Sequence, residues 1–493
     1  MNISARIIED LYSIGNLQHR LCCSFFSQDP IYNNKKRYMP LQQYKKRLKT
    51  SFFIALCFFA TSCGSPTVPN ALLSLIERGS IKVGTLYGAA TYYNGAEGPQ
   101  GFEYELLAGF SDYVGVTLDL YPFYSYDAML EQLAEGNLDI VATGDAVTDA
   151  LMMRFTYGPA YQTVAQHLVY RAGTTRPREL NSLAEPVVTV SGSSQAQLLA
   201  VLNNTSESLL VTTEDSDAEE LLQKVATGDI AYTLADSNRL ALQRRRHPNL
   251  AVGLTLREEM PMAWALNPEL DDSIKAAIIE YFGTVHQSGW FTVLEEKYFG
   301  HIRQFDYVDS RAFNQSAESL LKDYKSMFQQ YAGDLDWRLL AAMSYQESHW
   351  DPDAISRTGV RGLMMLTMDT ANDWDVEDRT DAEQSIRGGS RYFASLLGRI
   401  PARIGDPDRT WMAMAAYNLG LGHLEDARIL TERQGGNPDL WVDVKQRLPQ
   451  LRQKKYYRTT RYGYARGDEA LQYVDNIRRY YDSLLWLDEQ GRI

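Results

Sequence analysis

The residue best placed to do chemistry in this sequence is a glutamate, Glu347, near the end of a short predicted helix. Asp336 suits the start of that helix, because its carboxylate can accept from the free N–H groups of a first helical turn. Pro352 ends the helix, since the residue before a proline is pushed out of the α region. The spacing i, i+3, i+4 and i+7 places three residues on the face of Glu347: Leu340, Met343 and Ser344.

That face is otherwise apolar, so we expect the Glu347 carboxyl group to point inward. A carboxyl group held against apolar surface is desolvated, and its pKa rises. A general acid that works near neutral pH needs such a raised pKa. The alternative is a glutamate at a fraying helix end, exposed to water.

Four further motifs follow Glu347-Ser348 in order. They are Ser356, Gly362-Leu-Met-Met-Leu366, Ala415-Ala-Tyr-Asn418 and Tyr473-Val-Asp-Asn-Ile477. The five together resemble the lysozyme-like catalytic domain of the soluble lytic transglycosylase family. The resemblance implies an α-rich fold that acts on the glycan strands of peptidoglycan.

The resemblance also implies roles for individual residues. Glu347 matches the catalytic acid and base, Ser356 the serine that contacts the N-acetyl side of the substrate, and Tyr417 the tyrosine near the catalytic carboxyl group. Met365 stands where most relatives have a sugar-binding glutamine. Asn418 and Tyr473 complete the expected substrate-binding set. The alternatives are a core aromatic residue for Tyr417 and a loop cap for Ser356.

Glycosidases usually use two carboxyl groups, and no second acid has a fixed motif position here. Asp351, Asp353 and Glu383 are near only in sequence. We therefore expect a one-carboxyl lytic transglycosylase that cleaves the MurNAc–GlcNAc β-1,4 bond, forms 1,6-anhydro ends, and needs no metal and no cofactor. The alternatives are a non-catalytic glycan- or solute-binding protein and a true muramidase, which would be a hydrolase.

Strand and helix patterns alternate between about residues 70 and 300. Such alternation predicts an α/β domain with a largely parallel sheet. Because the series occurs twice and returns through 262–266, we expect two lobes around a cleft. The predicted strands are 81–86, 117–121, 138–143, 187–190, 209–212 and 230–234, and the predicted helices are 102–114, 126–135, one from Ser194, and 217–226.

This span resembles the extracytoplasmic solute-binding proteins of amino-acid ABC transporters. The segments that carry the resemblance are Gly101-Phe-Glu-Tyr-Glu105, Leu138-Asp-Ile-Val-Ala142 and Phe155-Thr-Tyr-Gly-Pro-Ala-Tyr161, followed by Asp236. Asp236 matches the position that binds the ligand ammonium group, although a helix N-cap is an equal reading. Leu151 stands where the family has an arginine that binds the ligand carboxylate. Arg154 is close in sequence but does not align with that position. We expect a muropeptide or stem peptide as ligand rather than a free amino acid.

The chain turns helical after an aperiodic joint at 297–309. The predicted helices are 317–331, one opened by a capping box at Thr380 and running to about 399, 409–419 and 469–487. No second series of alternating strands and helices appears, so the fold class is multidomain. A two-lobed periplasmic-binding-protein-like domain at 64–300 precedes an α-rich lysozyme-like domain at 301–493.

Residues 1–63 predict an export leader. Lys45-Lys-Arg-Leu-Lys49 is followed by an apolar run at 51–60 that is too short to span a bilayer. Thr61-Ser62-Cys63-Gly64 resembles a bacterial lipobox, which implies lipidation of Cys63 and a place on the periplasmic face of the outer membrane. Plain cleavage and an uncleaved anchor are the alternatives. Met39 begins a leader of more usual length, so residues 1–38 read as an over-extended start.

The charge pattern argues against a nucleic-acid partner. The formal net charge is −13 although residues 1–62 are basic, so the folded part is acidic. One stretch runs the other way: residues 445–466 contain eight Lys and Arg and no acid, interleaved with tyrosines. That stretch suits anionic stem peptides and sugar faces, or it is a solvated basic loop.

Overall fold

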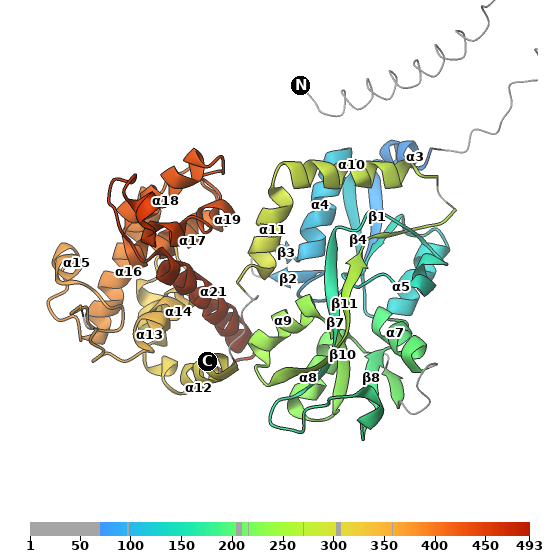
Figure 1. Ribbon diagram of the computed structural model, residues 1–493, viewed down its shortest axis with the longest axis horizontal. Helices are drawn as coiled ribbons and strands as arrows, with labels where there is room; N and C mark the ends of the chain where they lie inside the picture. The colour runs from blue at the N-terminus through green and yellow to red at the C-terminus, as the bar shows by residue number, and fades with distance from the viewer. Residues whose placement is uncertain are drawn as a thin grey trace, which may run out of the picture.

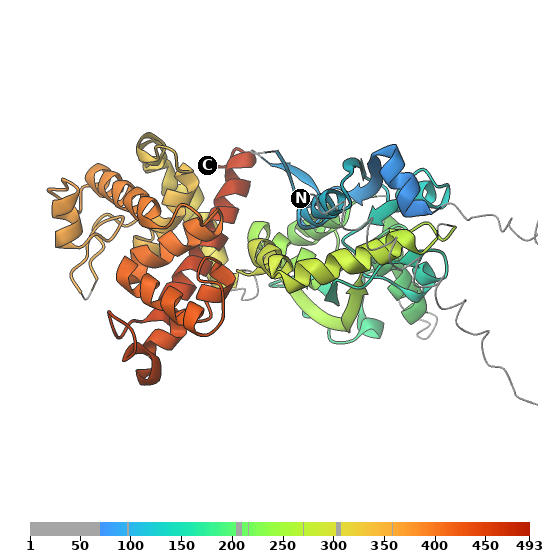
Figure 2. The same cartoon turned by 90° about the horizontal axis from the view of Figure 1, so that it is seen from above.

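The computed structural model describes residues 70–95, 98–203, 210–214, 216–269, 271–301, 307–356 and 358–493. The leader and Cys63 lie outside this range. The chain forms an α/β domain and a helical domain that lie side by side along the long axis, with the helix α21 (Gly467–Glu489) at the junction (Figures 1 and 2). The predicted fold class is confirmed.

The first lobe is built on a five-stranded sheet in the order β4-β1-β5-β12-β6. Its strands are β1 (Ser80–Leu86), β4 (Thr117–Phe123), β5 (Ile140–Ala142), β6 (Thr156–Tyr157) and β12 (Ala265–Leu266). Its helices are α3 (Ala71–Arg78), α4 (Phe102–Val114), α5 (Tyr126–Ala134), α6 (Asp149–Met152), α10 (Ser273–Gln287) and α11 (Trp290–Phe299). A two-stranded ribbon, β2 (Tyr93–Gly95) with β3 (Gly98–Gln100), projects from it.

The second lobe has its own five-stranded sheet in the order β11-β7-β10-β8-β9. The strands are β7 (Gln162–Arg171), β8 (Val187–Val190), β9 (Val211–Glu214), β10 (Tyr232–Asp236) and β11 (Leu250–Met262). The helices are α7 (Ser194–Asn203), α8 (Ala218–Thr227) and α9 (Ser237–Arg246), with a 3₁₀ turn, η1, at Leu180–Ser182.

Both sheets are mixed, so the prediction of a largely parallel sheet is wrong. The long strands β7 and β11 pair antiparallel with each other, and β7 also pairs antiparallel with β10. In the first lobe, β12 pairs antiparallel with β5 and β6. The alternating pattern identified the parallel pairs, β1 with β4 and β5, and the expected return through 262–266 contains β12, but the long strands β7 and β11 were not predicted.

The helical domain packs around one apolar core. Its helices are α12 (Tyr307–Ser319), α13 (Lys325–Tyr331), α14 (Trp337–Ser348), α15 (Met368–Asp373), α16 (Ala382–Arg399), α17 (Asp408–Leu419), α18 (Leu421–Arg433), α19 (Trp441–Val444), α20 (Lys454–Tyr457) and α21. The 3₁₀ turns η2 (Leu321–Asp323) and η3 (Leu448–Arg452) connect some of them.

Two local predictions in this domain are corrected. The single helix expected over 317–331 is α12, η2 and α13, because the turn at η2 lets both Leu321 and Phe328 reach the core. The cap of α16 is Asp381, whose carboxylate accepts from the backbone N–H of Gln384, one residue later than predicted. The joint at 297–309 also contains the end of α11 and the start of α12.

A cluster of buried and half-buried charges joins the two domains. Glu296 of α11 accepts from Arg478 of α21 at 2.7 Å and also pairs with Lys445. Arg245 of α9 pairs with Asp482 of α21 at 2.6 Å. Glu296 and Arg478 are only 5% and 4% exposed. Because either charge would be buried without compensation if the other were removed, this ion pair links the two domains.

Candidate active site and ligand pocket

Glu347 lies in the last turn of α14, as the sequence predicts. Asp336 caps the start of this helix by accepting from the backbone N–H of Arg338 at 2.9 Å. The helix ends where His349 takes a left-handed conformation, and the buried indole of Trp350 donates to the carbonyl of Ala341. Both ends of the helix are therefore held, and Glu347 is not part of a fraying end.

The Glu347 carboxyl group meets α21. The hydroxyl of Tyr473 donates to its Oε1 at 2.7 Å. Burial raises the pKa of Glu347 to about 7, and the hydrogen bond from Tyr473 opposes that rise. No charged neighbour in the described part of the chain adds to the shift. The carboxyl group is thus divided between its protonated and ionised forms at neutral pH.

The Gly362–Leu366 loop lies beside Glu347 and is bonded on several sides. The hydroxyls of Ser344 and Ser348 each donate to the carbonyl of Leu363 at 3.0 Å. The backbone N–H of Met364 donates to Ser385 at 3.1 Å. Because Ser344 and Ser348 belong to α14, their hydrogen bonds fix the position of the loop relative to the helix that carries Glu347.

Tyr417 and Met365 belong to the same site. The hydroxyl of Tyr417 donates to the carbonyl of Met364 at 2.9 Å. Burial raises the pKa of Tyr417 well above its ordinary value, and the negative charge of ionised Glu347 adds to this. Met365 is half-buried, with a positive φ of 45° at the turn of the loop. The structure therefore brings Glu347, Tyr473, Tyr417 and the Met365 loop together.

Ser356 and Asn418 form no hydrogen bond with Glu347, Tyr417 or Tyr473 in the described part of the chain. The Ser356 hydroxyl accepts from the backbone N–H groups of Thr358 and Val360, both at 3.2 Å, which is the loop-cap role. Asn418 is exposed at the end of α17.

The three acids near Glu347 in sequence form no hydrogen bond with it in the described part of the chain. Asp351 accepts from the backbone N–H of Asp353, and Glu383 accepts from the hydroxyl of Tyr331. Asp353 is exposed.

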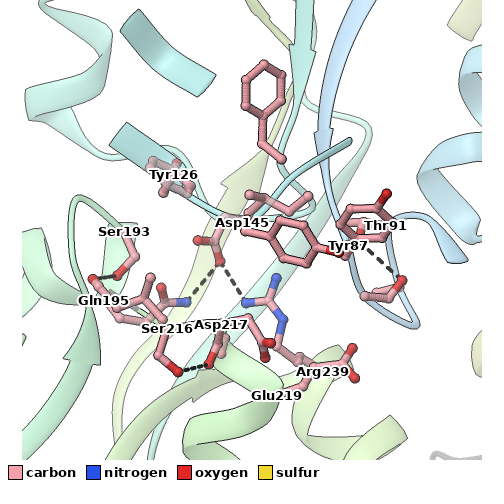
Figure 3. A pocket seen from close by; sticks show the side chains of 17 residues that line it. Tyr87, Thr91, Tyr126, Asp145, Ser193, Gln195, Ser216, Asp217, Glu219 and Arg239 are labelled. Carbon is pink, nitrogen blue, oxygen red and sulfur yellow. Dashed lines mark hydrogen bonds and ion pairs between the residues drawn. The ribbon is translucent and has the colours of Figure 1, made fainter. Parts of the chain in front are cut away.

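A second site, the interlobe pocket, lies in the α/β domain (Figure 3). Asp145, which follows β5 in the first lobe, lies between Gln195 and Arg239 of the second lobe. The Gln195 amide donates to Asp145 at 2.9 Å and the Arg239 guanidinium donates to it at 3.2 Å. The pocket wall also includes the stacked rings of Tyr87 and Tyr124, 4.7 Å apart between centroids.

Asp236 has a cation partner that the sequence reading missed. It caps α9 by accepting from the backbone N–H of Arg239, and it forms an ion pair with the Arg239 side chain at 3.3 Å. Asp236 therefore takes the helix N-cap role, and it is not among the residues that line the interlobe pocket. The spacing of three residues at a helix start was the signal for its ion pair with Arg239.

Leu151 and Arg154 play no part in the pocket lining. Leu151 is buried in the core of the first lobe, and Arg154 lies over the ring of Phe155 at 5.2 Å. The cleft does contain a buried arginine, but Arg239 is already paired with both Asp145 and Asp236.

Two family models match the chain. Residues 81–301 match the bacterial extracellular solute-binding proteins, family 3, and residues 326–439 match the transglycosylase SLT domain. The fold and the site thus define a modular enzyme, in which a solute-binding-like domain precedes a lytic transglycosylase domain.

Similar proteins extend over nearly the whole chain. A membrane-bound lytic murein transglycosylase F of Alteromonas mediterranea is 77% identical over 463 residues, which is 92% of this chain and 100% of the relative. Proteins of the same name from Idiomarina loihiensis and Pseudoalteromonas translucida are 50% and 48% identical, over 88% and 90% of this chain and 96% and 95% of their own lengths. The chain therefore belongs to the membrane-bound lytic murein transglycosylase F family.

The name of these relatives places them at a membrane. Within the described ranges, none of the helices has the length and apolar character needed to cross a bilayer.

Proposed function

We propose that the helical domain cleaves the MurNAc–GlcNAc β-1,4 bond of peptidoglycan with Glu347 as its one catalytic carboxyl group. The observation that carries this proposal is the environment of Glu347. Its pKa is raised to about 7 by burial, and its carboxyl group accepts a hydrogen bond from Tyr473. A carboxyl group in that state can both give and take a proton at neutral pH.

The reaction follows from these two capacities. Protonated Glu347 donates its proton to the glycosidic oxygen, and the bond between that oxygen and C1 of MurNAc breaks. The 2-acetamido group of the same sugar assists at C1, as in substrate-assisted glycosidases. The Glu347 carboxylate then takes the proton of the C6 hydroxyl, whose oxygen bonds to C1 and closes the 1,6-anhydro ring. Glu347 ends protonated, and no water is consumed.

The surrounding residues position this group. Tyr473 orients the carboxyl group, while Tyr417 fixes the Met364–Met365 turn against α14. We assign Met365 and Asn418 to sugar contacts, and Ser356 to the N-acetyl side, where its loop faces the substrate.

Mass spectrometry of the ends released from purified sacculi tests this function. We expect 1,6-anhydro-MurNAc ends from the wild-type protein. Reducing MurNAc ends would instead favour a muramidase, and binding of sacculi without release of fragments would favour a non-catalytic binding protein.

For the α/β domain we propose a muropeptide or stem peptide as ligand of the interlobe pocket. Asp145 and Asp236 already neutralise Arg239, so a free α-carboxylate in the closed cleft would lack a strong partner. An unpaired buried charge is costly, whereas a peptide has most of its α-carboxyl groups in amides.

Calorimetry on a protein that starts at residue 64 checks this ligand class. We expect no binding of single amino acids at millimolar concentration, and binding of a stem peptide. Micromolar binding of any free amino acid would contradict the proposal. Repeating the titration with Arg154→Ala would show whether this exposed arginine supplies the carboxylate contact.

For location we propose a lipid anchor at Cys63 and a place on the periplasmic face of the outer membrane. The lipobox-like sequence before Cys63 and the membrane-bound relatives support this. The wild-type protein should incorporate a labelled fatty acid and Cys63→Ala should not, and an unlabelled wild type would contradict lipidation. We also propose residues 64–300 and 301–493 as the two domains. The segment that matches the solute-binding family, 81–301, extends one residue past the first limit, and the segment that matches the SLT domain, 326–439, lies wholly within the second domain.

A further inference from the structure

We propose that a basic, tyrosine-rich surface of the helical domain is a second substrate contact, which binds the acidic stem peptides attached to the glycan strand. We call it the basic tyrosine patch. Its members are Lys454, Lys455, Arg458, Arg461, Tyr462 and Tyr464. This inference rests on the proposed cleavage of peptidoglycan. It adds that glycan strands with stem peptides bind more tightly than strands without them.

The cations of the patch are free to bind an external anion. Lys454, Lys455, Arg458 and Arg461 are all exposed, and within the described residues none of them has an ion pair. Their neighbours differ, because Arg452 pairs with Asp468 and Arg466 with Glu469. In a chain with a net charge of −13, four unpaired cations in eight residues form a local field of the opposite sign.

The patch has a defined shape. Asp426, which is 1% exposed, accepts from the backbone N–H groups of Arg461 at 3.0 Å and Tyr462 at 2.8 Å. The rings of Tyr457 and Tyr464 meet edge to face at 5.8 Å, which joins α20 to the loop. These contacts fix the backbone of the loop, so the cations and rings of the patch are held in defined positions.

The two exposed rings are presented to solvent with cations beside them. Tyr462 and Tyr464 are 53% and 52% exposed. The Arg461 guanidinium lies 5.4 Å from the centroid of Tyr462. Flat phenol faces stack on sugar rings, and a guanidinium group pairs with carboxylates in a bidentate manner. A glycan strand that carries acidic peptides offers both partners.

The patch adjoins the active site through two elements. Tyr462 packs on Gly422 and lies 6.1 Å from His423, in the first turn of α18, directly after the Tyr417–Asn418 motif. The loop then leads into α21, where Tyr473 stands six residues after Gly467, roughly 9 Å along the helix axis. Figure 1 shows α17, α18 and α21 in the same part of the helical domain. A strand bound at Glu347 can therefore extend over the patch.

The experiment compares two substrates with a charge-removing variant, Arg458→Gln with Arg461→Gln. On sacculi with intact stem peptides we expect KM to rise about three- to tenfold at constant kcat, the size expected for two exposed charge pairs. On glycan strands stripped of peptides by an amidase, the variant should match the wild type. Tyr462→Ala should raise KM on both substrates, because its ring contacts sugar.

Arg311→Gln with Lys322→Gln is the matched control, since it removes two exposed cations elsewhere in the same domain. It should leave KM unchanged on both substrates. An equal rise for the patch variant on both substrates, or no rise on either, would overturn the peptide contact. Failure of the wild type to cut stripped strands and sacculi alike would instead count against the proposed cleavage itself.

Discussion

In the proposed mechanism, Glu347 is prepared for acid catalysis by burial and by Tyr473, without a second carboxylate. Its pKa is raised to about 7 by burial, while Tyr473 donates a hydrogen bond that favours the ionised form. The two influences oppose each other, so the balance between them sets the pH range in which Glu347 can act as an acid. Both influences are open to test at the level of single residues.

Tyr473→Phe should move the alkaline limb of the pH–activity profile upward. Removing the hydroxyl removes stabilisation of the Glu347 carboxylate, so the pKa rises further and the acid stays protonated to higher pH. A hydrogen bond to a charged group is worth about 1.5–3 kcal/mol, which corresponds to a shift of about one pH unit or more. The check is kcat/KM measured against pH, and an unchanged or lowered limb would contradict this role.

Glu347→Gln should stabilise the protein in a pH-dependent way. The folded pKa of about 7 lies above the ordinary 4.5, so the contribution of Glu347 to stability is fully present below about 4.5 and lost as the pH rises through 7. The glutamine amide does not ionise, so the variant loses no stability at this position between pH 4.5 and pH 7. We expect the Tm difference between variant and wild type to grow from pH 4.5 to pH 7 and then level off.

Glu377→Gln, an exposed glutamate of the same domain, is the control for that measurement. Its Tm difference from the wild type should vary less with pH. A pH-independent difference for Glu347→Gln would mean that the carboxyl group is not desolvated.

Individual residues were predictable where periodicity and order along the chain placed them. The inward Glu347 follows from the apolar face of its helix, and Tyr417 and the Met365 loop follow from the ordered motifs. Arg239 and Asp145 were missed because 94 residues separate them, and they meet only when the two lobes face each other across the cleft. A local pattern contains no signal for such a pair.

At the scale of elements, the Gly362–Leu366 loop depends on one glycine. Gly362 has a φ of +82°, and a Cβ at this position would lie 1.7 Å from the carbonyl oxygen of Arg379. Both the backbone conformation and the contact therefore require glycine. The neighbouring Gly359 has a similar φ of +86° but open space around it.

Gly362→Ala should therefore destabilise the protein more than Gly359→Ala. The left-handed conformation alone costs about 1–2 kcal/mol, which is our expectation for Gly359→Ala. The clash at Gly362 should add about 1–3 kcal/mol and displace the loop from α14. Urea unfolding of both variants checks the order, and equal losses of stability would show that the loop can move aside.

The start of α14 was well predicted because Asp336 caps it, and the end of α4 at residue 114 is marked by the left-handed Gly115. The long strands β7 and β11 were not predicted, because their partners lie far away in sequence. Antiparallel pairing between distant strands depends on tertiary contacts that propensity does not encode.

At the scale of the whole molecule, the two domains share a buried ionic contact. Glu296 of the α/β domain is held between Arg478 and Lys445 of the helical domain. Arg478 also lies 3.8 Å over the ring of Trp411 on α17, the helix that carries Tyr417. Removing Glu296 would leave the buried Arg478 and the half-buried Lys445 without this anion.

Glu296→Ala should accordingly lower the Tm of the full chain. Breaking a buried pair costs about 3–5 kcal/mol, or at least about 6 °C for a domain of this size. Lys297→Ala is the control, because Lys297 pairs with Glu105 in a more exposed setting and should cost less than about 4 °C. Equal shifts in calorimetric scans would contradict a special role for the buried cluster.

The central claim is that one carboxyl group, Glu347, carries the cleavage of peptidoglycan. The most direct measurement compares wild type and Glu347→Gln for release of soluble fragments from purified sacculi, with sacculus binding and circular dichroism measured in parallel. We predict that the variant folds and binds sacculi as the wild type does, while its turnover falls by about 10²–10⁴-fold. Turnover above about a tenth of the wild-type value, with binding and fold intact, would contradict the single-acid account.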